Sequence, residues 1–180
     1  MADYQVPSDS PAPTKRELLA ALAASRDEVI ALVRALEPAR LEEGRYENGW
    51  NGRQILAHIA SIEWTYPKLI DIAREVTPPR SGEGPGVGSA GTPTRIAQGG
   101  ILSYNDRQVE KRAGASVEDL LAEFEQNRAA TIAAVESADE ALFTKEIRSA
   151  GGVTGPLASV INAIAVLHVL GHVNDIVGKG

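Results

Sequence analysis

The segment 155–171, GPLASVINAIAVLHVLG, restricts the possible folds more than any other part of the sequence. Its apolar residues occupy nearly all sides of a helix, so a stable fold must enclose it with other elements. The run falls short of the roughly 18 uninterrupted apolar residues that a membrane span needs, and it contains Asn162 and His168. We therefore expect a buried core helix and no membrane partner.

Three further segments show the periodicity of amphipathic helices. They cover residues 14–38, 51–75 and 116–137. Each opens with a capping box, in which two polar residues three positions apart bond each other's backbone. The pairs are Thr14 with Glu17, Asn51 with Gln54, and Ser116 with Asp119. Pro67 interrupts the second segment, where we expect a kink because proline lacks the N–H that a helix interior uses.

The chain has 180 residues and a mass of 19.0 kDa, which suits one domain whose core needs neither disulfides nor metals. The sequence shows no strand pattern and no internal repeat. These features predict an all-α domain over residues 14–180, built as a four-helix bundle. Residues 1–13 lack the charged and apolar stretches of a signal peptide, so we expect a flexible N-terminal tail and a cytoplasmic protein.

Residues 77–104 are rich in Gly, Pro and Ser and separate the second helical segment from the third. Their composition excludes regular structure for most of this length, and a loop this long is usually a lid, a binding loop or disordered. The next residues, 105–112, have the pattern of a short helix. We expect Asn105 to be its N-cap, with a position in a pocket as the alternative.

Two of the three histidines, His168 and His172, lie four residues apart in the predicted core helix. This spacing puts both imidazoles on one helix face, as in helices that offer two histidines to one metal ion. The alternative is that each is a core histidine bonded to a backbone carbonyl. The third, His58, lies about 10 Å from the start of the second helix, and His172 lies about 9 Å from the end of the fourth.

The three rings can meet only if the start of the second helix lies beside the end of the fourth. These two helices must then be antiparallel, which an up-down-up-down bundle forbids. An up-down-down-up bundle permits it if a long connection joins the second helix to the third. Because residues 77–104 are in that position, we predict an up-down-down-up bundle with a long crossover.

Three stretches of the sequence resemble one protein family. They are WNGRQILAHIASIEW around His58, HVLGH from His168 to His172, and YNDRQVEKRAGASVEDLLAEFEQNR in the middle of the chain. These stretches resemble the DinB-like superfamily of four-helix bundles, which includes the N-terminal domains of mycothiol-dependent maleylpyruvate isomerases and the bacillithiol transferases. The resemblance covers nearly the whole chain. It implies that the three histidines bind a divalent ion, commonly zinc or nickel, and that a low-molecular-weight thiol attacks an electrophile.

The composition limits the chemistry of such a site. With no cysteine, the chain can bind a metal only through nitrogen and oxygen, and it cannot supply a thiol itself. Three neutral imidazoles leave at least one coordination position open, as in catalytic zinc sites. A thiol held there would give a transferase, and a water molecule would give a hydrolase or lyase. The net charge of −6 argues against a nucleic-acid partner, because phosphate binding relies on clustered Lys and Arg.

Other polar residues are candidates for secondary roles. Asn127 and Arg128 interrupt the apolar stripe of the third helical segment, so they could bind substrate in the pocket or form bonds between helices. Asp175 follows His172 by three residues and could accept its second N–H, a role that a backbone carbonyl would also fill. For Glu63, which does not share a helix face with His58, we expect packing and solvation.

The sequence therefore predicts a metal-dependent enzyme that joins a low-molecular-weight thiol to an electrophilic small molecule. Two alternatives remain: a hydrolase or lyase on the same site, and a non-catalytic protein that sequesters a reactive ligand in self-resistance. An exposed apolar helix face would allow a homodimer. The sequence identifies neither the substrate, the thiol nor the metal, and it assigns no catalytic residue besides the proposed metal ligands His58, His168 and His172, whose part in catalysis is left open.

Overall fold

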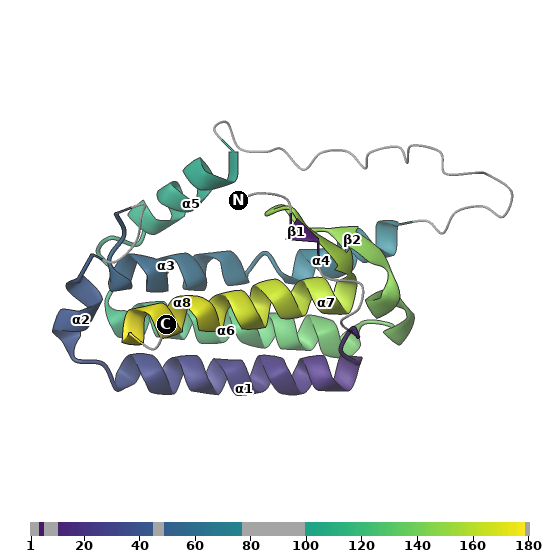
Figure 1. Cartoon of the computed structure of the whole chain (residues 1–180), viewed down its shortest axis with the longest axis horizontal. Coiled ribbons are helices and arrows are strands. Elements are labelled where there is room, and N and C mark those ends of the chain that lie inside the picture. Colours follow the sequence, from purple (N-terminus) through teal and green to yellow (C-terminus); the bar gives the residue numbers. More distant parts are fainter. Residues whose placement is uncertain (1–3, 6–10, 45–48, 77–99, 179–180) are drawn as a thin grey trace, which may run out of the picture.

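The computed structural model describes residues 4–5, 11–44, 49–76 and 100–178. Most of them are helical, which confirms the predicted helical class (Figure 1). The helices are α1 (Lys15–Arg34), α2 (Pro38–Glu42), α3 (Gly52–Glu63), α4 (Pro67–Glu75), α5 (Gly100–Glu110), α6 (Val117–Ser137), α7 (Leu157–Ile161) and α8 (His168–Val177). A π-helical segment, η2 (Asn162–Leu167), joins α7 to α8, and a 3₁₀ turn, η1 (Glu140–Thr144), follows α6.

The predicted capping boxes are present at the starts of α1, α3 and α6. In α3, the Asn51 side chain accepts a hydrogen bond from the backbone N–H of Gln54, whose own side chain accepts one from the backbone N–H of Asn51. The segment with Pro67 is two helices rather than one kinked helix, because α3 ends at Glu63 and α4 begins at Pro67. Proline suits a first helical position, where its missing N–H has no intrahelical partner to lose.

The structure contains a three-stranded sheet that the sequence does not predict. β1 (Tyr4–Gln5) pairs in parallel with β3 (Val153–Pro156), and β2 (Glu146–Arg148) pairs with β3 in antiparallel fashion. Two residues of the predicted N-terminal tail over residues 1–13 thus form a strand, β1. Strands of two to four residues are too short to show the alternation that reveals a strand in a sequence.

Helix α5 begins earlier than predicted. It starts at Gly100, so residues 100–104 are helical rather than part of the crossover, and Asn105 lies inside the helix rather than at its N-cap. Only Val109 of this helix is buried, so no apolar stripe marks the helix in the sequence. The rest of the predicted crossover, residues 77–99, lies outside the described residues. Helix α5 packs beside α3 (Figure 1).

Contacts between distant residues give the direction of the helices that carry the histidines. At the start of α3, Gly52 lies against Ile176, near the end of α8. Beyond the end of α3, the Tyr66 hydroxyl donates a hydrogen bond to the carbonyl oxygen of Ile164 in η2. Along the direction from Gly52 to Tyr66, residue numbers therefore rise in α3 and fall in the adjacent segment of α8 and η2. The two helical segments are antiparallel (Figure 1).

Helices α1 and α6 are also antiparallel. Arg34, the last residue of α1, pairs with Glu118 in the first turn of α6. Lys15, the first residue of α1, donates a hydrogen bond to the carbonyl oxygen of Ala138, just after α6. In Figure 1, α6 runs in the same direction as α3, and α1 runs in the same direction as α7 and α8.

The apolar core consists of two clusters of side chains, and the last helical segment contributes to both. Leu157 and Ile161 belong to one cluster and Val173 to the other. By length and composition alone, the continuous helix Leu157–Val177 is long and apolar enough to cross a membrane, with a mean hydropathy of 1.6 over an 18-residue window. Its buried side chains pack against α1, α3 and α4.

Candidate metal centre

Three histidines from two antiparallel helices lie together. His58 is in α3, and His168 and His172 are one turn apart in α8. One nitrogen from each ring lies within 4.8 Å of the other two. The ring centroids are 6.0 Å apart for His58 and His168, 5.5 Å for His58 and His172, and 4.4 Å for His168 and His172. The structure thus brings all three histidines of the chain into one cluster.

Local features of each helix explain this convergence. The capping box at Asn51 fixes the start of α3, so His58 falls about two turns into the helix. On α8, the four-residue spacing places His168 and His172 on one face, one above the other. Because α3 and α8 are antiparallel, the beginning of one helix lies beside the end of the other, and the two faces meet.

Burial holds the three rings in their neutral form. The pKa of His58, which is 5% exposed, falls to about 3, mainly because burial disfavours its charged form and secondarily because His172 and His168 would repel the charge. Burial, followed by repulsion from His172, lowers the pKa of His168 to about 4. Burial also lowers the pKa of His172. Neutral imidazoles keep the lone pair that a metal ligand must offer.

A cavity of about 250 Å³ adjoins the histidines. Its other lining residues are Trp50, Leu102, Asn105 and Asp106. The Trp50 ring lies 5.3 Å from the His58 ring, and Leu102, which is 65% exposed, lies on the outer side. The cavity is therefore partly apolar, has the three histidines in its wall, and has room for a small ligand.

The residues of the cluster fit a divalent ion. Their donors are three neutral nitrogens, the ligand type of many catalytic zinc sites. The Nδ1 atom of His58 is buried and has no hydrogen-bond partner among the described residues. No carboxylate from the described part of the chain joins the group. In a tetrahedral site the nitrogens would lie about 3.3 Å apart, which is below the 4.8 Å within which the three ligand nitrogens lie here.

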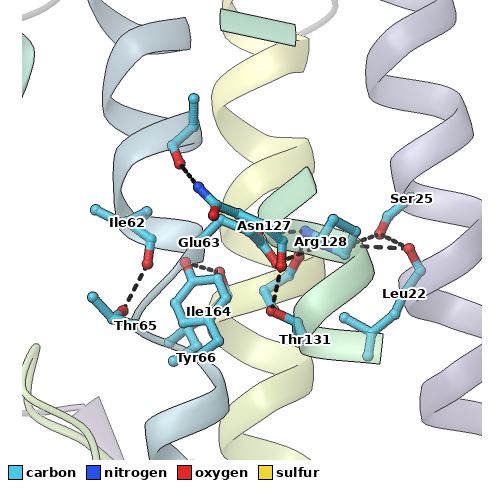
Figure 2. Close-up of polar contacts among 12 residues, drawn as sticks. Leu22, Ser25, Ile62, Glu63, Thr65, Tyr66, Asn127, Arg128, Thr131 and Ile164 are labelled. Atoms are coloured by element: carbon cyan, nitrogen blue, oxygen red, sulfur yellow. Dashed lines mark hydrogen bonds and ion pairs between the residues drawn. The ribbon is translucent and has the colours of Figure 1, made fainter. Parts of the chain in front are cut away.

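Arg128 and Asn127, expected to bind substrate or to bond between helices, do not line the cavity. Arg128 is fully buried and pairs with Glu63, with Nε at 2.7 Å from one carboxylate oxygen and Nη2 at 3.0 Å from the other (Figure 2). Asn127 donates a hydrogen bond from Nδ2 to the Ala60 carbonyl oxygen at 3.1 Å. Both residues therefore form bonds between helices, which was the alternative to binding substrate. The expectation that Glu63 is solvated is wrong, because Arg128 satisfies its carboxylate.

The ion pair is the main electrostatic feature of the core. Burial raises the pKa of the Glu63 carboxyl, and the positive charge of Arg128 opposes this change. The carboxylate accepts two guanidinium hydrogen bonds, so the site holds its ionised form. Asp175 lies on an exposed part of α8, and the outer-shell role expected for it stays a prediction.

Three of the residues that line the cavity, Trp50, Leu102 and Asp106, are not among the site residues predicted from the sequence. Leu102 and Asn105 are three residues apart, a spacing that puts both on one helix face. An earlier start for α5 would have revealed this pattern. Asn105 occupies the pocket position that the sequence left as the alternative to an N-cap, and its Oδ1 atom is buried without a partner among the described residues.

Comparisons with known proteins agree with this fold. The sequence profile of the mycothiol maleylpyruvate isomerase N-terminal domain matches residues 22–166. A crystal structure of the mycothiol-dependent maleylpyruvate isomerase is similar to this chain, with a TM-score of 0.65 and 18% identity over 93% of this chain and 61% of that chain. A crystal structure of a histidine-to-alanine mutant of that enzyme gives a TM-score of 0.64 and 17% identity over the same shares. No curated protein matches the chain.

At such low identity, the two crystal structures show a shared fold, and this chain spans 61% of the length of the first. The sequence profile covers most of the chain, including His58, and ends just before His168. This match confirms the DinB-like resemblance predicted from the sequence, and the chain belongs to the mycothiol maleylpyruvate isomerase N-terminal domain family.

Proposed function

We propose that His58, His168 and His172 bind one divalent ion, zinc or nickel, and that the protein transfers a low-molecular-weight thiol to an electrophilic small molecule. The observation that carries this proposal is the approach of three imidazole nitrogens to within 4.8 Å of one another beside a cavity. The lowered pKa values of the rings favour the neutral form that binds metals.

The chemistry follows from the histidines and the other cavity residues. A divalent ion there would supply an open coordination position and lower the pKa of a thiol. The chain has no cysteine, so the thiol must come from a cosubstrate. Its sulfur forms a bond to the electrophilic carbon in one of two ways. In a displacement the leaving group departs with the bonding electron pair and the thiol proton passes to solvent. In an addition to a double bond the neighbouring atom takes up a proton in place of the one that the thiol loses. Trp50 and Leu102 provide apolar surface beside the histidines.

The related structures support a thiol as cosubstrate. Both belong to an isomerase described as mycothiol-dependent, and the family profile carries the same thiol in its name. In this chain, Asn105 would accept a hydrogen bond from an N–H or O–H group of the cosubstrate, because its buried Oδ1 atom has no partner among the described residues. The thiol and the electrophile in this protein are part of the proposal.

We further propose that the four long helical segments form an up-down-down-up bundle. The contacts of Gly52 with Ile176 and of Tyr66 with Ile164 support an antiparallel second and fourth segment. The contacts between α1 and α6 support the remaining order. This arrangement is the one that lets His58 meet the two histidines of α8.

A fluorogenic conjugation assay tests the thiol transfer. Metal-loaded protein is incubated with monochlorobimane and, in turn, with mycothiol, bacillithiol or glutathione. We expect metal-dependent conjugation with at least one thiol, and loss of that activity in His168→Ala, which removes one ligand. Gly171→Ala is a matched control on the same helix, because a Cβ at Gly171 would meet nothing within 4 Å.

Equal rates for wild type and His168→Ala with every thiol would refute the transferase proposal. Metal-dependent turnover of an ester or amide substrate without thiol would favour the hydrolase alternative instead. Tight ligand binding without turnover would favour the sequestering protein.

A further inference from the structure

Arg128 connects four helical elements from the centre of the protein. Its guanidinium donates to both Glu63 oxygens, to the Leu22 carbonyl oxygen at 3.1 Å, to Ser25 Oγ at 2.7 Å, and to the Ala165 carbonyl oxygen at 2.5 Å (Figure 2). These bonds use every N–H donor that an arginine side chain has. They tie α6 to α1, α3 and η2, although Arg128 itself does not line the cavity.

Two of the carbonyl groups that accept side-chain hydrogen bonds are consecutive residues of the π-helical segment. Ala165 accepts from Arg128, and Ile164 accepts from the Tyr66 hydroxyl at 2.9 Å. Tyr66 is itself almost fully buried. The backbone N–H of His168 reaches back five residues to Ala163, the bond that characterises a π-helix. Two buried donors, one on α6 and one just before α4, therefore bond to the segment directly before His168.

The π-helical conformation determines where the α8 histidines point. A π-type turn accommodates one extra residue compared with an α-helical turn. If η2 relaxed to an α-helix, every residue after it would rotate by about 100° around the helix axis relative to α7. His168 and His172 would then turn away from His58. The histidine cluster thus depends on the conformation of η2, in addition to the antiparallel packing of α3 and α8.

We propose that Arg128 and Tyr66 are positioning residues for the metal centre, which hold η2 in its π-helical form and so direct His168 and His172 towards His58. Glu63 supports the same positioning role. It lies on α3, the helix that carries His58, and its carboxylate orients the Arg128 guanidinium. This inference rests on the proposed metal site, and it assigns a role to core residues that do not touch the metal.

The test compares Co²⁺ binding by full-length, untagged variants. Tyr66→Phe removes only the hydroxyl donor to Ile164. The double variant Arg128→Met with Glu63→Leu removes the guanidinium without leaving a buried carboxylate unpaired, which would itself be strongly destabilising. Ser25→Ala is the matched control, because it removes a partner of the same guanidinium on α1 and leaves the bond to Ala165 in place.

We expect both test variants to weaken Co²⁺ binding by about 10-fold or more, the usual effect of losing groups that orient metal ligands. Their Co²⁺ absorption spectra should change, because the histidines present a different geometry. In the metal-free proteins, amide hydrogen exchange should accelerate in residues 162–167. Ser25→Ala should keep the affinity, the spectrum and the slow exchange of that segment, whatever its effect on thermal stability.

Unchanged Co²⁺ affinity, spectrum and exchange in Tyr66→Phe and in the double variant would overturn this inference and leave the proposed metal site intact. If the double variant does not fold, the result for Tyr66→Phe decides. Failure of the wild-type protein to bind Co²⁺ would overturn the metal site and the positioning role together.

Discussion

Asn105 has a buried side-chain oxygen that no described residue satisfies, and it lies in the wall of the histidine cavity. An unsatisfied buried acceptor costs about 1–3 kcal/mol, so a ligand that donates a hydrogen bond to it recovers that free energy. The same reasoning applies to Nδ1 of His58, whose lone pair suits a metal ion. Two atoms without partners therefore mark the site, one for the metal and one for the ligand.

Replacing Asn105 with leucine tests the first of these roles. Asn105→Leu keeps a similar volume and removes the acceptor, so we expect the dissociation constant of the thiol cosubstrate to rise about 5-fold or more, with metal content unchanged. Isothermal titration of the metal-loaded protein with the thiol measures this. Gln108→Leu, an equivalent change on the same helix but outside the cavity lining, should leave thiol binding as in wild type. An unaltered dissociation constant in Asn105→Leu would remove this residue from the ligand site.

At the scale of elements, the sequence predicts those features that depend on neighbouring residues. The capping boxes mark the starts of α1, α3 and α6, because each pair bonds its own first turn. The π-helical form of η2 has no such local signal, since the carbonyl groups of Ile164 and Ala165 accept hydrogen bonds from Tyr66 and Arg128, which lie far away in the sequence. The pairing of Glu63 with Arg128 likewise depends on the packing of α3 against α6, which residue spacing along one helix does not reveal.

The close approach of α2, α3 and α8 at Gly52 gives a prediction for element packing. A Cβ at Gly52 would lie 3.1 Å from the Leu41 Cα and 3.2 Å from Ile176 Cγ2, so the backbone of α2 would have to move. We expect Gly52→Ala to lower the free energy of unfolding by about 1–3 kcal/mol. Gly171→Ala has open space around its Cβ and should raise it by about 0.5–1 kcal/mol through helix propensity.

Urea unfolding followed by circular dichroism measures both glycine variants. Equal stability of Gly52→Ala and Gly171→Ala would contradict the tight packing assigned to the start of α3.

At the scale of the whole molecule, the histidine cluster depends on contacts across the chain. The four-residue spacing of His168 and His172 and the family resemblance predict that these residues meet His58. The depths of the three histidines in their helices then predict that the two helices are antiparallel, because helix rise is nearly constant. It does not predict the sheet that joins Tyr4–Gln5 to Val153–Pro156, because its strands are short and pair across the length of the chain. The position of a residue along a helix can be counted in a sequence, whereas the pairing of two short, distant strands cannot be read from it.

Burial of neutral histidines also makes the stability of the metal-free protein depend on pH. The pKa of His58 is about 3 in the folded chain and about 6.5 in the unfolded chain. As the pH falls below about 6.5, the unfolded chain therefore binds a proton at this residue while the folded chain does not. The free energy of unfolding must therefore fall between pH 6.5 and 3, with about 2 kcal/mol lost through His58 by pH 5.

Urea titrations of chelator-treated protein at pH 7 and pH 5 measure this dependence. His58→Gln cannot titrate at this position, so its loss of stability between the two pH values should be smaller than that of wild type by about 2 kcal/mol. A variant that loses as much stability as wild type would show that His58 is not held neutral by the fold.

The central claim is that His58, His168 and His172 bind one divalent ion, and elemental analysis of untagged protein tests it most directly. After incubation with zinc or nickel and removal of free metal, wild type and Gly171→Ala should each retain a single equivalent per chain. His58→Ala, His168→Ala and His172→Ala should each lose most of it while keeping their helical circular dichroism, because the core does not depend on the ion. Wild-type protein that retains neither metal, or a His168→Ala variant that retains as much as wild type, would contradict the account.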